Sequence, residues 1–219
     1  MKNGKIGTKK IGKNRIVVGI DQSYADSGIA VVYNGRLMAV TDCKPKSTDD
    51  NTAVRKQFRG QLRKIFGRMQ IKQQAKEDCE LVCIIERIRL QSAKPGEQHF
   101  LNLNYIKGIG ALNALIVDTA SEFGIPVYSV DTRSWKSQVI GSSKPGCNKF
   151  GFPNEKWPTI AWCIGKGYGK WIAEEVSPKK KKGVVVKGDK RFTYNDNKAD
   201  AIGIAMYGFV REPKLEEEH

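Results

Sequence analysis

Length, composition and charge exclude several classes of protein. The chain has 219 residues, 40% of them hydrophobic, which is enough for one compact domain with a core of its own. No stretch approaches the roughly 18 to 20 consecutive apolar residues of a membrane-spanning helix, so no membrane partner is expected. Five scattered cysteines without paired Cys-X-X-Cys motifs argue against a zinc site and favour reduced thiols in the cytoplasm.

The positive charge is concentrated in three segments. Within a formal net charge of +15, residues 1–15 contribute +6, residues 51–76 contribute +8 and residues 177–191 contribute +6. One such segment alone can be a solvated arm, but three of them favour a nucleic acid partner. The basic residues expected to contact DNA away from any catalytic centre are Arg55, Arg59, Arg63, Lys149, Lys179, Lys180, Lys181 and Lys182.

Three strands open the predicted domain. They cover residues 16–21, 28–33 and 36–41. The dipeptide Asn34-Gly35, between the second and third strands, is typical of a two-residue hairpin turn. Apolar side chains between Val54 and Met69 then recur at helical spacing, which predicts an amphipathic helix over residues 55–76 with a cationic outer face.

A strand–helix–strand unit follows. The continuous apolar run at residues 81–85 predicts a strand buried on both faces. Helical spacing between Ile106 and Phe123 predicts the next helix, and residues 127–130 form the next strand. This order predicts that the two strands run parallel in one sheet.

The last third of the chain is harder to interpret. Residues 142–194 are rich in Gly, Pro and Lys and contain a short predicted helix at residues 158–164. Residues 195–210 are again helical, with Asp196 or Asn197 as the expected N-cap.

Three acidic residues stand within apolar sequence. Asp21 ends the first predicted strand, Glu86 ends the fourth, and Asp200 lies in the last helix. An ionised carboxylate that is buried without a partner costs several kcal/mol, so such residues usually meet a cation. In a basic protein that binds phosphates the natural cation is Mg²⁺, and two such ions about 4 Å apart promote in-line hydrolysis of a phosphodiester.

Each acid also has a simpler structural interpretation. Asp21 can cap the first hairpin, and Asp200 can be an ordinary acid in the first turn of a helix. Glu86 can pair with Arg87 or Arg89 at the end of its strand. Taken singly, these interpretations weigh as much as metal binding, but the three acids in this order favour a metal site.

Four motifs along the chain carry a family resemblance. They are Val-Val-Gly-Ile-Asp21-Gln-Ser23 with Gly28 shortly after it, Ile-Ile-Glu86, Val-Asp131-Thr-Arg-Ser-Trp135-Lys136-Ser-Gln-Val-Ile-Gly141, and Lys198-Ala-Asp200-Ala-Ile-Gly-Ile-Ala. Together they resemble the RuvC family of Holliday junction resolvases, particularly its phage-type members. The resemblance extends from about Ile16 to Met206.

The resemblance implies an α/β fold of the RNase H-like type, with a five-stranded mixed sheet flanked by helices. It implies a homodimer that cuts branched DNA symmetrically at four-way junctions with two Mg²⁺ ions, for which Mn²⁺ can substitute. Its setting would be recombination and repair in the cytoplasm of a bacterium or a phage-infected host. Asp21, Glu86 and Asp200 would be catalytic metal ligands, and Lys136 a catalytic residue that contacts DNA beside them.

The fourth metal ligand departs from the family pattern. The family places Asp or His three residues before the last Asp, and this chain has Asn197 there, with Asp196 one residue earlier. Both positions share a helical face with Asp200, so the carboxylate of Asp196 or the amide oxygen of Asn197 can serve. We favour Asp196 slightly, and either residue can instead be the helix cap. A smaller departure is Asp21-Gln22-Ser23, where the family usually has Asp-Pro-Gly.

The expected organisation is a single nuclease domain with basic extensions. A basic arm covers residues 1–15, the nuclease domain covers residues 16–211 with a basic loop at 177–193, and a tail covers residues 212–219.

Three alternative functions differ in what they require. The Gly-Ile-Asp motif followed by Gly28 also resembles the first phosphate loop of the actin and sugar kinase superfamily, but 219 residues are too few for its two domains. A ribonuclease H or transposase core shares the acids but usually lacks the Trp-Lys motif. A catalytically silent DNA-binding protein is the non-enzymatic alternative, and the missing fourth acid is its best support.

Overall fold

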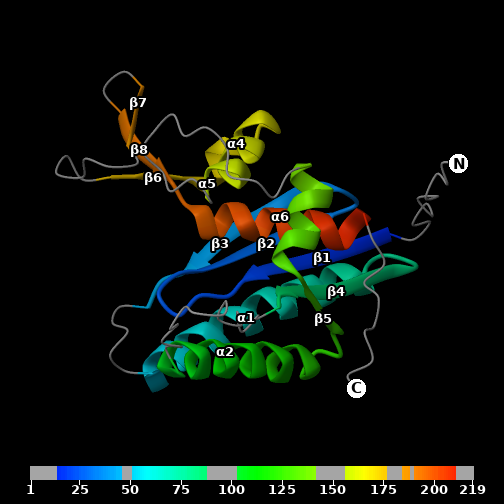
Figure 1. The fold of residues 1–219 in the computed structure, drawn as a ribbon. Helices are drawn as coiled ribbons and strands as arrows, with labels where there is room; N and C mark the ends of the chain where they lie inside the picture. The colour runs from blue at the N-terminus through cyan, green and yellow to red at the C-terminus, as the bar shows by residue number, and fades with distance from the viewer. Residues whose placement is uncertain are drawn as a thin grey trace, which may run out of the picture.

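The fold is organised around a five-stranded sheet with the strand order β3-β2-β1-β4-β5 (Figure 1). This computed structural model describes residues 14–45, 51–87, 103–141, 156–176, 184–187 and 190–210. The strands are β1 Asn14–Asp21, β2 Ser27–Tyr33, β3 Arg36–Cys43, β4 Cys79–Glu86 and β5 Val127–Val130. The first three strands are antiparallel, whereas β1, β4 and β5 are parallel, so the predicted mixed sheet and its strand–helix–strand unit are confirmed.

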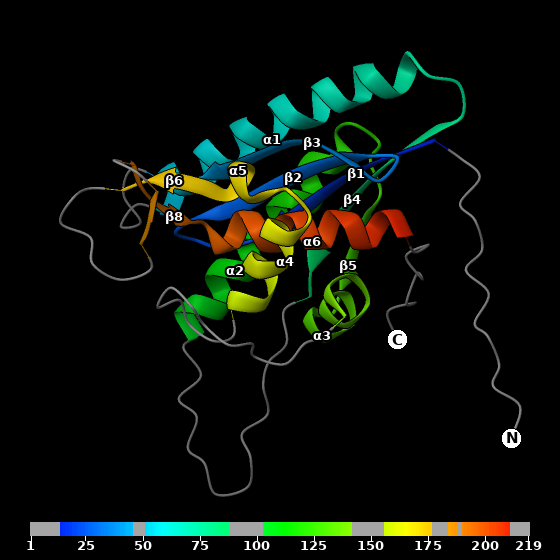
Figure 2. The same ribbon diagram turned by 90° about the horizontal axis from the view of Figure 1, so that it is seen from above.

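Helices cover both faces of this sheet (Figures 1 and 2). One face carries α1 Asn51–Gln74 and α2 Leu103–Ser121, close to the predicted helices. The other face carries α6 Asp196–Val210, α4 Trp157–Gly165 and the short α5 Gly169–Ile172. After β5 the chain forms α3 Thr132–Trp135 and continues directly into a π-helix, η1 Lys136–Ile140, which the sequence analysis did not foresee.

The period-two alternation of strand side chains divides the core into two layers. In β1, Ile16, Val18 and Ile20 are buried against α1 and α2. Val17 belongs to the α6 layer, so Gly19 and Asp21, at the following alternate positions, face the same side. The carboxylate of Asp21, the last residue of β1, is therefore directed towards α6.

Two glycines allow α6 to lie very close to the sheet. A Cβ atom at Gly19 would stand 2.4 Å from the backbone nitrogen of Ala205, and one at Gly28 would stand 2.1 Å from the carbonyl oxygen of Asn197. Gly28 is the register partner of Asp21 in the β1–β2 ladder. The backbone of the first turn of α6 thus rests on the strand position beside Asp21.

A second, smaller sheet lies in the segment that the sequence left unassigned. It has the order β6-β8-β7, with β6 Ala173–Glu175, β7 Val185–Lys187 and β8 Lys190–Tyr194. The predicted helix at residues 158–164 is confirmed by α4. The predicted N-cap of α6 was wrong, because the Oδ1 atom of Asn195 accepts a hydrogen bond from the backbone N–H of Lys198 at 2.9 Å and so caps the helix one residue earlier.

Several expectations fall wholly or mainly outside the described residues. These are the basic arm, most of the loop at 177–193, and the tail. Four of the five cysteines are described, and each is a buried free thiol. Among the described helices, none combines the length and apolar character that crossing a bilayer requires.

Candidate active site

Two of the three predicted carboxylates end neighbouring parallel strands. Asp21 is the last residue of β1 and Glu86 the last of β4, and the register pairs Ile20 with Ile85 immediately before them. Strand geometry therefore places the two carboxylates side by side, facing α6. Asp200 reaches the same region from α6. Burial and then the like charges of Asp200 and Glu86 raise the pKa of Asp21 well above its usual range.

The negative charge of Asp200 is only partly compensated by neighbouring groups. Burial raises the pKa of Asp200, and the ammonium group of Lys136 opposes this rise. The Nζ atom of Lys136 lies 3.6 Å from the Oδ2 atom of Asp200. The hydroxyl of Thr159 is close enough to lower the pKa of Asp200 as well, but neither this hydroxyl nor the other carboxylate oxygen, Oδ1, has a hydrogen-bond partner among the described residues, and both are buried. An oxygen in this state is an available ligand for a cation.

Glu86 is held by polar side chains from two other segments. Its backbone N–H donates to the Oε1 atom of Gln22 at 3.2 Å, and the amide of Gln22 donates back to the carbonyl of Glu86. The hydroxyl of Thr132 donates to the carboxylate. Burial raises the pKa of Glu86, and the Thr132 hydrogen bond opposes this. Gln22, a departure from the family motif, therefore holds the backbone of Glu86 through two hydrogen bonds.

The structure separates the two candidates for the fourth ligand. Asp196 is close enough to the acids that its charge contributes to the raised pKa values of Asp21 and Asp200. The side-chain amide of Asn197 instead donates to the backbone carbonyl of Asp26 at 2.6 Å, in the loop after β1. Of the two, Asp196 is brought to the acids, whereas Asn197 anchors the helix to a loop.

Two lysines accompany the four carboxylates. Lys136 begins the π-helix directly after the fully buried Trp135, and its own side chain is 15% exposed. Lys156, immediately before α4, forms an ion pair with Asp196. Burial disfavours the charged form of Lys156, but the hydrogen bond and charge of Asp196 outweigh it and raise its pKa. Lys156 was not predicted from the sequence, where its only signal is a lysine preceding the Trp-Pro start of a helix.

We call these residues the acid cluster. It comprises Asp21, Glu86, Asp196 and Asp200 with Lys136 and Lys156. As they stand, no three Asp, Glu, His or Cys side chains in the described part of the chain form a group that could hold a metal ion. The donor chemistry nevertheless suits a hard divalent cation, because four carboxylates face only two ammonium groups and one carboxylate oxygen is buried without a partner.

The predicted DNA contacts on α1 lie apart from the acid cluster, since α1 covers the opposite face of the sheet from α6 (Figure 1). Arg55 is exposed. Arg59 and Arg63 both pair with Glu122 of the α2–β5 connection, at 2.8 and 2.7 Å. Lys149 and the predicted contacts at 179–182 fall outside the described residues.

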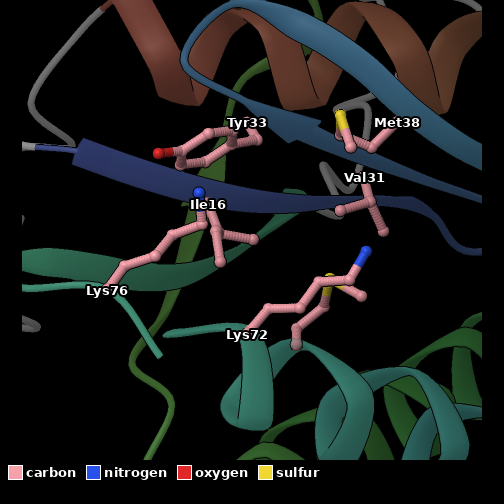
Figure 3. Close-up of a pocket in the computed structure, with 7 residues that line it drawn as sticks. Ile16, Val31, Tyr33, Met38, Lys72 and Lys76 are labelled. Carbon is pink, nitrogen blue, oxygen red and sulfur yellow. The ribbon is translucent and has the colours of Figure 1, made fainter. Parts of the chain in front are cut away.

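A cavity of about 190 Å³ lies between α1 and the sheet (Figure 3). Its lining residues are Ile16, Val31, Tyr33, Met38, Met69, Lys72 and Lys76. The ammonium group of Lys76 lies over the ring of Tyr33, 3.9 Å from its centroid. Ile16 and Asp21 belong to opposite ends of β1 and face opposite sides of it, so this cavity is separate from the acid cluster.

Comparison with known proteins identifies the fold. No protein-family model matches the chain, and no curated protein matches it either. Among solved structures, Thermus thermophilus RuvC in complex with a Holliday junction substrate matches at 15% sequence identity, covering 89% of this chain and 93% of that one, with a TM-score of 0.53. A second structure of T. thermophilus RuvC matches at 16% identity with the same coverage and a TM-score of 0.51. The predicted RNase H-like fold is thereby confirmed, and it is the fold of RuvC.

Proposed function

We propose that this protein is a metal-dependent endonuclease that cuts four-way and related branched DNA, as a phage-type member of the RuvC resolvases. The observation that carries the proposal is the acid cluster: on a RuvC fold, four carboxylates from β1, β4 and α6 converge with two lysines at one end of the sheet. The net charge of +15 supports a polyanionic substrate.

Asp21, Glu86, Asp196 and Asp200 would hold two Mg²⁺ ions. When bound, such ions supply an activated water and stabilise the leaving oxygen of a phosphodiester. The residues of the chain then have distinct tasks. Thr132 and Gln22 fix the orientation of Glu86 before substrate arrives. Lys136, next to Asp200, is placed to neutralise a phosphate oxygen where negative charge develops in the transition state.

The wider DNA surface is also a proposal. Arg55 and the basic residues 179–182 would bind phosphates of the junction arms, with Lys149, Arg59 and Arg63 as further contacts. Arg59 and Arg63 would have to share their charge between Glu122 and DNA, because both already pair with that carboxylate. A homodimer would present two acid clusters to the two strands that a symmetric cut requires.

The test is cleavage of a labelled synthetic four-way junction beside a linear duplex of the same sequence, each with Mg²⁺ and with EDTA. We expect paired nicks in the junction only, and only with Mg²⁺. Asp21→Asn, Glu86→Gln and Asp200→Asn should each reduce cleavage to background while binding the junction as tightly as the wild type or more tightly, because a carboxylate that repels phosphate is removed.

Other outcomes would identify the alternatives. Cleavage of the linear duplex or of an RNA–DNA hybrid in preference to the junction would indicate a different RNase H-like nuclease. Tight junction binding without any metal-dependent cleavage would indicate a catalytically silent DNA-binding protein. Near wild-type cleavage by one of the three variants would remove that residue from the site.

A further inference from the structure

A second polar cluster lies beside the acid cluster, around Glu174 of β6. The carboxylate of Glu174 accepts hydrogen bonds from Lys198, Lys44 and Asn195, each at 2.8 Å. Lys44 also pairs with Asp42 at 2.9 Å and with Asp26 at 3.4 Å. We call these six residues the Glu174 cluster.

The Glu174 cluster connects four segments that are distant in sequence. Asp26 lies in the loop after β1, Asp42 and Lys44 at the end of β3, Glu174 in β6, and Asn195 and Lys198 at the start of α6. Asn195 contributes twice, because its amide donates to Asp26 at 3.0 Å and its carbonyl oxygen caps α6. The cluster therefore holds the first turn of α6 to the ends of two strands and to the small sheet.

Lys198 lies on the opposite side of this turn from the candidate metal ligands. At 100° per residue, Lys198 is about 200° around the helix from Asp196 and from Asp200. Its ammonium group pairs with Asp42 at 3.3 Å, and its side chain is 14% exposed. One side of the turn thus carries two carboxylates towards Asp21, while the other side is fixed by Lys198.

The strand register shows why this attachment matters for the geometry of the acids. Asp21, Gly28 and Asp42 are successive register partners across β1, β2 and β3, about 4.8 Å apart from strand to strand. The backbone of Asn197 rests on Gly28, the middle member of this row. The ion pairs of Lys198 with Asp42 and Glu174 therefore fix the orientation of this turn over Gly28. That orientation determines the distances of Asp196 and Asp200 from Asp21.

Within this cluster the charge of Glu174 is well compensated, whereas burial raises the pKa of Asp26. Burial disfavours ionisation of Glu174, but the hydrogen bonds from Lys198, Lys44 and Asn195 outweigh it and lower its pKa to about 2. Glu174 is therefore a persistent anion at neutral pH, as an anchor for two lysines requires.

We propose that Glu174 is a positioning residue for the metal site: through Lys198, Lys44 and Asn195 it fixes the first turn of α6 so that Asp196 and Asp200 meet Asp21 at the separation that divalent cations require. This inference rests on the proposed function and adds to it a residue that is not one of the candidate metal ligands.

The test compares Glu174→Gln with Glu122→Gln. Both substitutions neutralise a carboxylate that holds two cationic side chains, but Glu122 joins Arg59 and Arg63 far from the acids. Three quantities are measured on the whole protein: Mn²⁺ affinity of the free protein by electron paramagnetic resonance, the Mg²⁺ concentration for half-maximal junction cleavage, and amide hydrogen exchange of residues 197–200 without metal.

For Glu174→Gln we expect about 10-fold weaker Mn²⁺ binding, a similar rise in the Mg²⁺ requirement and faster amide exchange in the first turn of α6. The cleavage rate at saturating Mg²⁺ should stay within about 3-fold of the wild type. General destabilisation would lower this rate together with the metal affinity, so a change in affinity alone indicates positioning. Glu122→Gln should keep the wild-type Mn²⁺ affinity. Wild-type Mn²⁺ affinity in folded Glu174→Gln would overturn the proposal.

A second variant keeps the proposal testable if Glu174→Gln fails to fold. Lys44 is more exposed, so Lys44→Met perturbs the fold less and should shift Mn²⁺ affinity in the same direction by a smaller factor. An unchanged affinity in this variant would count against the positioning role. A different outcome separates this proposal from the proposed function. If the wild type has no nuclease activity but binds Mn²⁺ more tightly than Glu174→Gln does, the proposed function is disproved and the positioning role of Glu174 stands.

Discussion

Two polar clusters flank the first turn of α6, and they are built from the same kinds of side chain with different charge balance. The acid cluster sets four carboxylates against two lysines, and the pKa of Asp21 is raised by burial and by its acidic neighbours. The Glu174 cluster sets three carboxylates against two lysines and an asparagine, and the pKa of Glu174 is lowered to about 2. The carboxylate of Glu174 is compensated by its lysines and holds neighbouring segments together, whereas the acid cluster is shorter of positive charge and is suited to bind a cation.

Beyond the three carboxylates tested above, the largest effect should come from removing a positive charge from the acid cluster. Lys136→Ala removes the ammonium group nearest Asp200, and we expect the single-turnover rate at saturating enzyme to fall about 100-fold, or about 2.7 kcal/mol. Quenched-flow cleavage of the labelled junction measures this rate. A rate within 3-fold of the wild type would show that Lys136 serves the fold or DNA affinity alone.

A smaller effect should separate the two residues that begin α6. Asp196→Ala removes a charged oxygen from the acid cluster and should slow cleavage about 30-fold, or about 2 kcal/mol. Asn197→Ala removes only an anchor to the Asp26 carbonyl and should cost much less. The comparison is made at several Mg²⁺ concentrations. The reverse ranking would make Asn197 the ligand, and equal small losses would leave a site of three carboxylates.

Replacing a lysine of the Glu174 cluster by an uncharged residue should destabilise the fold. Lys198→Met removes one of the two lysines paired with Asp42 and with Glu174 and leaves both carboxylates with Lys44 as their paired lysine. Removing one partner of a fully buried pair costs about 3–5 kcal/mol, and the remaining exposure reduces this to about 1.5 kcal/mol. The melting temperature should fall by about 3–6 °C. An unchanged value would mean that the Glu174 cluster contributes no stability.

Neutralising an anion in the acid cluster should have the opposite sign. Without metal, Asp21→Asn relieves repulsion from three carboxylates, and we expect a gain of about 1 kcal/mol, or a melting temperature about 2–4 °C higher in EDTA. Added Mg²⁺ should stabilise the wild type and not the variant. A melting temperature below that of the wild type in EDTA would contradict the idea that this cluster is short of positive charge.

The main sheet and its helices were predictable because their sequences repeat with the period of their structure. The apolar runs from Ile16 to Ile20 and before Glu86 specify strands buried on both faces. The π-helix at Lys136–Ile140 and the small sheet were not predictable. A π-turn differs from an α-turn by one residue, and the small sheet draws its strands from short runs among glycines and lysines that carry no clear period.

Within the candidate site, the residues embedded in apolar sequence could be predicted, and those held by long-range contacts could not. Asp21, Glu86 and Asp200 stand out because a charge in a core segment requires an explanation. Lys156 and Glu174 lie in polar sequence where a charge is unremarkable, and their partners Asp196 and Lys198 are distant along the chain. Only the folded chain identifies such pairs.

The docking of α6 on β1 also determines when the acid cluster forms during synthesis of the chain. Asp21 is made early, whereas Asp196 and Asp200 belong to the last helix that the structure describes. A nascent chain that ends before α6 holds only Asp21 and Glu86, and it exposes the sheet face on which that helix will pack. Contacts between such distant segments form late and slowly in folding. The four carboxylates of the acid cluster therefore come together only after α6 has been made and has packed on the sheet.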